Sequence, residues 1–400
     1  MYPSLRSTSF PFVITLLVLF MSGCSDDKVQ SFYNPTAATL PTPSITSVTP
    51  SGSAVAGIDT IYVKGTGFST TLSENFVVFN AQPAQVVSAT PTEIKLLAPL
   101  LVNDSVVVRV SVHGAYEFSN KVSYALKAAV AVFGDLSSTE LSTAVAADAA
   151  GNVYSSFSLN GIEAGVLKFN AAGVRSVYAP KTGGDWTGLK MGPGAYLYAV
   201  RNIRAVYRFA PGGGAIAAIW ASQGAGISFF DFDFDQNGNL WAGGNNTSIY
   251  RYAPDKSFVT VPFTGNIHSM RVFAGSLYWA AKTDAGEKIW RAPITADGLG
   301  TPEIYFDFAA AYPQNIPLAI TFSSDGDLYI GINSQAGIVI VTPQKNYYTP
   351  LTVYKQLFGK GVDVITWGKA NDLYCSTTDG LLLKLNVTGK KSAPYYGAAQ

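Results

Sequence analysis

Charged residues are scarce in this sequence. Asp, Glu, Lys and Arg make up 13% of its 400 residues, about half of the ~25% that is usual in soluble domains. The net charge is +1, and no basic or acidic block occurs. We therefore expect no nucleic-acid partner, because binding a phosphate backbone needs a concentrated positive surface. Glycine, tyrosine and phenylalanine are plentiful instead, which is typical of turns and strands.

Histidine and cysteine are almost absent. The two histidines are His113 and His268, and Cys375 is the only cysteine after Cys24. This number is too small for a histidine-rich metal site or for duplicated histidine-dependent catalytic pairs. No Gly-x-Ser-x-Gly nucleophile turn is present either. We predict no catalytic residue, no metal site and no cofactor.

The first 24 residues have the pattern of an export signal. The apolar run from Phe10 to Met21 is too short to span a membrane. The motif MSGC that ends at Cys24 resembles a bacterial lipoprotein signal, which implies that Cys24 is lipidated. The acidic pair Asp26 and Asp27 resembles the export signal of surface lipoproteins. We expect a protein that is exported, anchored to the outer membrane through its lipid alone, and exposed at the cell surface.

Residues 25–42 are rich in Pro, Ser and Thr and lack periodicity, which predicts a flexible linker. Residues 43–126 contain about seven short alternating strands separated by turns, the pattern of a small β-sandwich. This segment resembles the immunoglobulin-like IPT/TIG family, in which the domain is mostly a spacer or docking module. The residues that carry the resemblance are Ile45, Ser47, Val48, Pro50, Ser51, Ile61, Gly65, Gly67, Phe68, Thr92, Ile94, Pro99, Ser119 and Asn120.

A six-fold repeat occupies residues 127–400. Each unit has an alternating strand, a turn and a second strand that opens with an aliphatic residue followed by an aromatic one. The six aromatic residues are Tyr154, Tyr198, Trp241, Tyr278, Tyr329 and Tyr374. Short strands repeating at 37 to 51 residues predict a six-bladed β-propeller. The predicted fold class is therefore all-β, with a small immunoglobulin-like sandwich followed by this propeller.

The turns of the propeller resemble those of NHL repeats. The best matches are the segments 148–152, DAAGN, and 235–239, DQNGN. A closed ring usually builds one blade from both ends of its chain. We therefore expect the strand near Ala129 to Phe133 to complete the sixth blade from outside.

Loops at one face of a propeller surround its channel, and these loops carry the predicted ligand-binding residues. The set is Glu140, Asp185, Trp186, Asn202, Arg204, Asn245, His268, Lys282, Asn333 and Asp363. Amides, a few charges and an indole suit a polar, uncharged ligand such as a sugar. Trp186 is the sharpest candidate, because it follows Gly-Gly-Asp outside the alternating strands. Asparagine is also favoured in tight turns, so each asparagine has a structural alternative.

Three functions remain open. The architecture resembles that of sandwich-plus-propeller lipoproteins of glycan-uptake systems, which implies capture of a polysaccharide or oligosaccharide. The alternative is a scaffold that docks to an outer-membrane transporter or another surface protein. A propeller hydrolase is less favoured. In a lactonase-like enzyme of this kind, Glu140, Asn202 and Asn245 could hold a channel metal, but their local sequence does not resemble the motifs of such enzymes.

Overall fold

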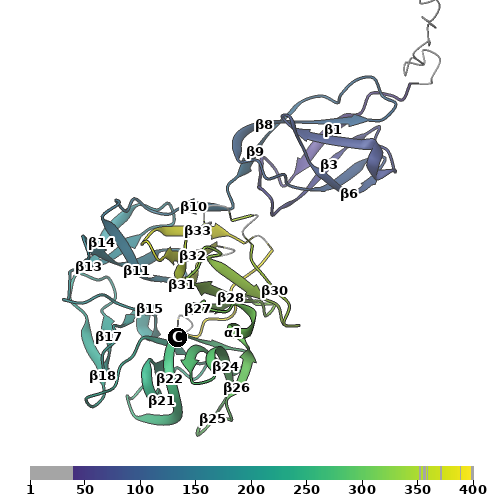
Figure 1. Cartoon of the computed structure of the whole chain (residues 1–400). Helices are drawn as coiled ribbons and strands as arrows, with labels where there is room; N and C mark the ends of the chain where they lie inside the picture. Colours follow the sequence, from purple (N-terminus) through teal and green to yellow (C-terminus); the bar gives the residue numbers. More distant parts are fainter. Residues whose placement is uncertain are drawn as a thin grey trace, which may run out of the picture.

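The computed structural model describes residues 39–350, 353–354, 357, 359–369, 372–387 and 389–397. The predicted signal peptide, Cys24 and most of the predicted linker lie outside these residues. The described chain forms an all-β sandwich followed by a propeller, which confirms the predicted fold class (Figure 1). Within the described residues, no helix is long and apolar enough to cross a membrane.

Two sheets form the sandwich. The first has the order β1 (Ser44–Thr49), β3 (Thr60–Thr66), β7 (Glu93–Leu97), β6 (Gln85–Thr90). The second has the order β2 (Ser53–Val55), β9 (Val122–Lys127), β8 (Asn103–Val112), β4 (Asn75–Phe79), β5 (Gln82–Pro83). A short 3-10 turn, Leu72–Glu74, precedes β4.

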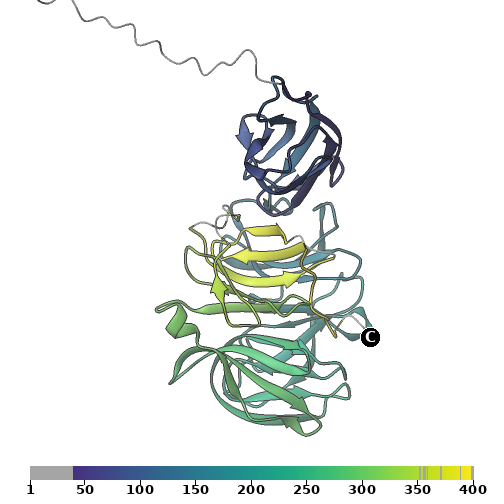
Figure 2. The ribbon, with the colours of Figure 1, turned by 90° about the vertical axis from the view of Figure 1, so that its right-hand side faces the viewer.

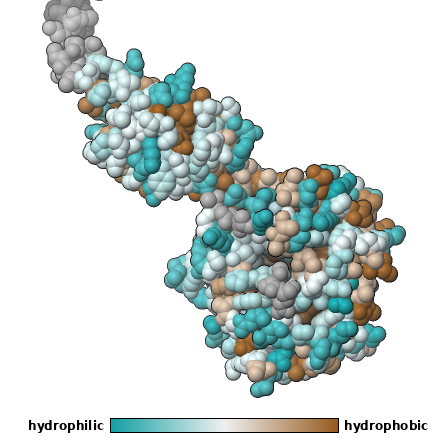
Figure 3. Space-filling view, turned by 180° about the vertical axis from the view of Figure 1, so that it is seen from behind, coloured by the Kyte–Doolittle hydropathy of each residue, from teal (hydrophilic) through white to brown (hydrophobic). Residues whose placement is uncertain are grey.

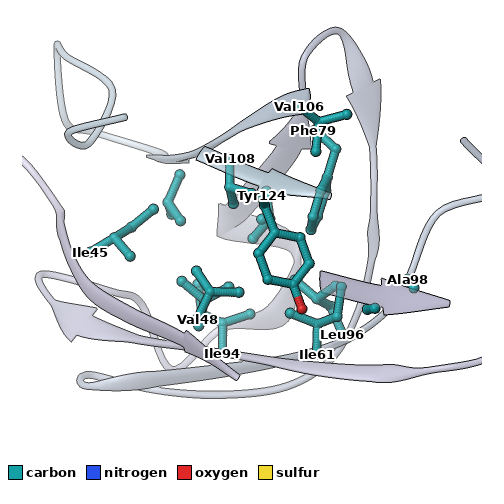
Figure 4. Close-up of a cluster of buried hydrophobic side chains, with 14 of the residues drawn as sticks. Ile45, Val48, Ile61, Phe79, Ile94, Leu96, Ala98, Val106, Val108 and Tyr124 are labelled. Carbon is teal, nitrogen blue, oxygen red and sulfur yellow. The ribbon is translucent and has the colours of Figure 1, made fainter. Parts of the chain in front are cut away.

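Strand alternation builds the core of the sandwich. In β3, Ile61 and Val63 are fully buried, whereas Lys64 is exposed. Figure 4 shows the aliphatic side chains of both sheets converging on the ring of Tyr124. The Tyr124 hydroxyl donates a hydrogen bond to the carbonyl oxygen of Pro50 at 2.8 Å, so its polar end is satisfied inside an apolar core.

Six blades surround the channel of the propeller in the described chain (Figure 1). The first blade contains β11 (Glu140–Ala147), β12 (Val153–Leu159), β13 (Ile162–Phe169) and β14 (Arg175–Ala179). The second contains β15 (Gly188–Met191), β16 (Leu197–Val200), β17 (Ala205–Phe209) and β18 (Ala218–Ser222), with a 3-10 turn at Pro193–Ala195. The third contains β19 (Asp231–Phe234), β20 (Leu240–Gly243), β21 (Asn245–Tyr252) and the first half of β22 (Phe258–Phe273).

The fourth blade begins with the second half of β22, so one strand serves two blades. Its other strands are β23 (Ser276–Thr283), β24 (Gly286–Thr295), β25 (Gly298–Leu299) and β26 (Glu303–Phe306). After α1 (Phe308–Ala311), the fifth blade contains β27 (Pro317–Phe322), β28 (Leu328–Ile332), β29 (Ile338–Val341) and β30 (Tyr347–Tyr348). The sixth contains β31 (Val362–Trp367), β32 (Asp372–Thr377), β33 (Leu382–Asn386) and β10 (Val130–Val132).

The ring is closed by strands from both ends of the propeller. β10 pairs antiparallel with β33, and Val130 lies opposite Leu385. The expectation that a strand near Ala129 to Phe133 completes the sixth blade is confirmed. Beside this closure, Val55 of the sandwich is buried in one cluster with Ala129 and Val130. The sandwich therefore sits above the sixth blade in the side view (Figure 2).

Candidate functional site

In each blade, the aromatic residue of the second strand lies opposite one residue of the innermost strand. The six residues of the innermost strands that are paired in this way define one level of the channel. We call it the charged level. Its members are Ala146, Lys190, Asp233, Arg271, Thr321 and Thr366. Three residues earlier in each blade, on the innermost strand or directly before it, lies a second level, which we call the mouth ring. Its members are Thr143, Thr187, Phe230, His268, Leu318 and Asp363.

A cavity of about 240 Å³ occupies the channel, and five mouth-ring residues line it: Thr187, Phe230, His268, Leu318 and Asp363. Each of these five is half-buried. The cavity continues past the charged level, where Lys190, Asp233 and Arg271 line its wall. Its volume is somewhat below the ~300 to 1,000 Å³ that is typical of small-ligand sites.

One side of the cavity is a network of charges from three consecutive blades. Asp233 is fully buried, and its Oδ2 accepts hydrogen bonds from Arg271 Nη1 at 2.8 Å and from the backbone N–H of Val272 at 2.7 Å. Lys190 Nζ lies 3.3 Å from Asp231 Oδ1 and 3.7 Å from Asp233 Oδ1. Two cations and two carboxylates thus compensate one another, which makes their burial tolerable.

These carboxylates also join the blades. Asp231 Oδ2 accepts hydrogen bonds from the backbone N–H of Met270 at 2.7 Å and from Ser269 Oγ at 2.9 Å. Ser269 Oγ in turn accepts from the backbone N–H of Ile320 at 3.1 Å. The edge of each innermost strand would otherwise leave unpaired N–H groups facing the channel. Side chains of the preceding blade satisfy the N–H groups of Met270, Val272 and Ile320.

The opposite side of the cavity is mostly apolar, with Ala319, Ile320, Val364 and Ile365 in its lining. Asp363 interrupts this wall near the mouth, and Asp148, Thr321, Thr366 and Lys369 also line the cavity on this side. The Oδ1 atom of Asp363 is buried and has no hydrogen-bond partner among the described residues. Burial raises the pKa of Asp363 to about 7, because the ionised carboxylate loses solvation there. The cavity therefore combines a charge-compensated wall, an apolar wall and one titratable acid near its mouth.

The C-terminal segment covers part of the channel base. Tyr395 lines the cavity, and its hydroxyl donates a hydrogen bond to the carbonyl oxygen of Met191. Arg271 Nη2 donates to the carbonyl oxygen of Pro394 at 3.1 Å, and the Arg271 guanidinium lies 5.2 Å from the centre of the Tyr395 ring. The charged level thus holds the segment in place.

Of the ten residues predicted from sequence, the channel cavity includes His268 and Asp363. His268 Nε2 lies 3.2 Å from Glu287 Oε2. Asn245 and Lys282 line a separate cavity between the third and fourth blades. Asp185 and Arg204 are exposed outside both cavities.

The structure contradicts the exposed position expected for Trp186. Its side chain is 1% exposed, and it packs edge-on against Tyr207 and Phe209 at centroid distances of 5.3 and 5.5 Å. The residue follows a glycine-rich turn, but the chain folds back so that the indole fills the interior of the second blade. It cannot cover a ligand in the channel.

Three other predicted residues have structural partners. Glu140 accepts hydrogen bonds from Arg175 Nη1 at 2.9 Å, and it does not line the cavity. The pKa of Glu140 is lowered, chiefly by the backbone N–H of Ser137. Asn202 has a positive φ of 45°, and Asn333 Oδ1 accepts from the backbone N–H of Ile316 at 2.7 Å. For both asparagines the turn alternative agrees with the geometry.

Sequence reasoning missed the charged level, although a signal was present. Asp231 and Asp233 alternate with phenylalanines on a strand with buried positions on both faces. A buried carboxylate needs partners, so such a strand predicts cations nearby. Lys190 and Arg271 occupy the same register in neighbouring blades.

Comparisons with known proteins identify the family of the sandwich domain and support the fold. Residues 43–126 match the IPT/TIG domain model, which confirms the predicted family for this segment. No curated protein matches the chain by sequence.

Solved structures are similar to the chain at low identity. An auxiliary nutrient binding protein from Bacteroides thetaiotaomicron is 13% identical, with a TM-score of 0.51 over 88% of this chain and 98% of that one. A gluconolactonase from Xanthomonas campestris is 16% identical, with a TM-score of 0.51 over 64% of this chain and 89% of that one. A luciferin-regenerating enzyme is 13% identical, with a TM-score of 0.54 over 67% and 98%. At these identities the likeness shows the fold alone.

The residues considered for a lactonase-like metal site do not converge. Glu140 is paired with Arg175, Asn202 occupies a turn, and Asn245 lines the separate cavity. In the described part of the chain, no three His, Cys, Asp or Glu side chains form a group that could hold a metal ion.

Proposed function

We propose that this protein captures a carbohydrate in the propeller channel as part of a glycan-uptake system at the cell surface. The observation that carries the proposal is the two-sided cavity, with compensated charges on one wall and aliphatic side chains on the other. A sugar likewise presents hydroxyl groups at its rim and an apolar ring face. We expect the charged wall to bind the hydroxyl groups of the sugar and the apolar wall to contact its ring face.

The charges of the cavity favour a neutral ligand. Lys190 and Arg271 are balanced by Asp231 and Asp233. An anionic or cationic ligand would compete with one half of this network and leave the other half unpaired. A neutral ligand that offers hydroxyl groups can accept from or donate to the network without breaking it. Asp363 adds one carboxyl group to the cavity lining near the mouth.

Phe230 takes the role first assigned to Trp186. It is half-buried in the mouth ring and lines the cavity. An aromatic ring at this position can cover the apolar face of a sugar.

The domain architecture supports the same function. The chain resembles the nutrient binding protein over both of its domains. The lipoprotein signal that ends at Cys24 belongs to the proposal, with the anchor in the outer membrane and the propeller outside the cell. Assignment of the blades to the NHL family is part of the proposal too, and rests on the turns 148–152 and 235–239.

A glycan array probed with the purified full-length protein tests the proposal. We expect retention of at least one neutral glycan, and about tenfold weaker binding by Phe230→Ala, since one aromatic contact contributes about that much. Phe76→Ala is the matched control, because Phe76 is 55% exposed on the sandwich. Absence of binding to every neutral glycan would contradict carbohydrate capture.

Docking to an outer-membrane transporter is the second candidate. Hydrophobic residues are exposed on the outer strands of the first two blades, where Val177 is 77% and Ile219 is 60% exposed. Figure 3 shows hydrophobic patches at this margin of the propeller. Co-purification of a transporter that is lost in a Val177→Asp, Ile219→Asp variant, while glycans are not retained, would favour this function.

A further inference from the structure

A second cavity opens between the third and fourth blades, on the face of the propeller that carries the mouth ring. Its volume is about 590 Å³. Hydrogen-bonding side chains dominate the lining, which is formed by Gly226, Ile227, Asn245, Asn246, Thr247, Thr264, Gly265, Asn266, Lys282, Thr283, Asp284 and Ala285. We call it the blade cavity.

Several polar groups of the blade cavity have no partner. Asn245, Asn266, Lys282 and Asp284 are exposed, and their side chains make no hydrogen bond or ion pair with any described residue. Asn246 differs, since its amide bonds both backbone groups of Ser228 at 2.9 and 2.6 Å. The structure thus uses one asparagine to fix the loop and leaves the others free to contact a ligand.

The blade cavity and the channel cavity adjoin along β22. Asn266 lines the blade cavity and His268 lines the channel. These residues are two positions apart, which corresponds to about 7 Å along a strand. The loop before β19 makes the same connection, because Ile227 lines the blade cavity and Phe230 lines the channel cavity. A ligand that leaves the channel at the third and fourth blades therefore reaches the blade cavity directly.

We infer that the blade cavity is a subsite for further units of an oligosaccharide whose end occupies the channel. The inference rests on the proposed carbohydrate function. Lys282 and Asp284 contribute one positive and one negative charge, so the lining remains suited to a neutral ligand. Amides and hydroxyls provide the donors and acceptors that sugar hydroxyls need. The C-terminal segment covers part of the base of the channel, so the ligand extends outward from the mouth.

Calorimetric titration of the full-length protein can test the subsite. The probes are glucose, mannose, galactose and xylose, each compared with its di- to hexasaccharides. We expect the oligosaccharides of the preferred sugar to bind about tenfold more tightly than the monosaccharide, as two or three added hydrogen bonds would give. The double variant Asn266→Ala, Lys282→Ala should lose this gain and leave the affinity for the monosaccharide unchanged. Lys181→Ala, which removes an exposed lysine outside both cavities, is the matched control.

The outcomes separate the two proposals. If no probe binds, carbohydrate capture fails and the subsite fails with it. If the monosaccharide binds through Phe230 but longer chains gain nothing, the subsite alone is wrong. The same conclusion follows if the double variant weakens the monosaccharide and the oligosaccharides equally. Thermal melting of each variant verifies that the fold is retained.

Discussion

The indole Nε1 of Trp241 donates a hydrogen bond to Asp235 Oδ2 at 2.9 Å. The same carboxylate accepts from the backbone N–H groups of Asn237 and Asn239. In the first blade, Asp148 Oδ2 accepts from the Tyr154 hydroxyl at 3.0 Å in the same arrangement. The six-residue spacing between the turn aspartate and the aromatic residue therefore has a structural cause. One carboxylate holds the turn and anchors the buried ring of the second strand.

Replacement of Asp235 by alanine should destabilise the propeller by about 2 kcal/mol, because it leaves the buried indole N–H unpaired and releases the turn. Urea unfolding measures the change. Asp297→Ala removes an exposed aspartate, and it should have a much smaller effect. Trp241→Phe combined with Asp235→Ala should cost less than the sum of the two single changes.

The buried pair of Arg271 and Asp233 predicts a larger loss. Either Asp233→Asn or Arg271→Met leaves a buried charge without its partner, which should lower the free energy of unfolding by about 3 to 5 kcal/mol. Lys64→Ala breaks the exposed pair with Glu93, whose atoms lie 3.8 Å apart, and should cost at most about 1 kcal/mol. If the buried and exposed variants lose the same stability, the charged level does not hold the ring together.

Asp363 should make stability depend on pH in the direction opposite to a salt-bridged carboxylate. Its pKa is raised from an ordinary value near 4 to about 7. Between these values the native protein retains a proton that the unfolded chain releases. The free energy of unfolding therefore falls as the pH rises through this window. Asp363→Asn removes the titrating group, so wild type minus variant should decline from about pH 4 to about pH 7.

Chemical unfolding at a series of pH values provides this difference. Asp297→Asn, at an exposed position, measures the background from a surface carboxyl. A difference for Asp363→Asn that rises with pH would contradict the raised pKa and, with it, the buried carboxyl near the channel mouth.

Substitution of Trp186 should chiefly lower stability, whereas substitution of Phe230 should chiefly weaken glycan binding. Trp186→Ala empties a space within the second blade and should cost about 3 to 5 kcal/mol, while the remaining folded protein binds glycans as the wild type does. Phe230→Ala should weaken binding and change stability less, because its ring is only half-buried. Thermal melting and glycan retention, measured on both variants, check this contrast. Loss of glycan binding by the folded Trp186→Ala variant would contradict the assignment of Phe230, rather than Trp186, as the aromatic residue that contacts the ligand.

The fold could be predicted from the sequence because the repeat itself shows which residues occupy equivalent positions in successive blades. Aromatic residues such as Tyr198 and Tyr329 are buried at equivalent positions, and their spacing is visible without coordinates. The site was harder to predict. The innermost strands are covered by a neighbouring blade on both faces, so alternation does not reveal which side chains line the channel. Trp186 was misplaced because a residue after a flexible turn can point either way, and only the packing against Tyr207 decides.

Closure of the sixth blade has a consequence for the order of events during folding. Val130 pairs with Leu385, so all the residues between them have to be synthesised before this sheet can form. Contacts between such distant segments slow folding, because the entropy of a very long loop is lost before the contact forms. A nascent chain of this protein therefore remains incomplete as a ring until β33 (Leu382–Asn386) emerges, and any chain that stops before β33 has an open sheet edge exposed to aggregation.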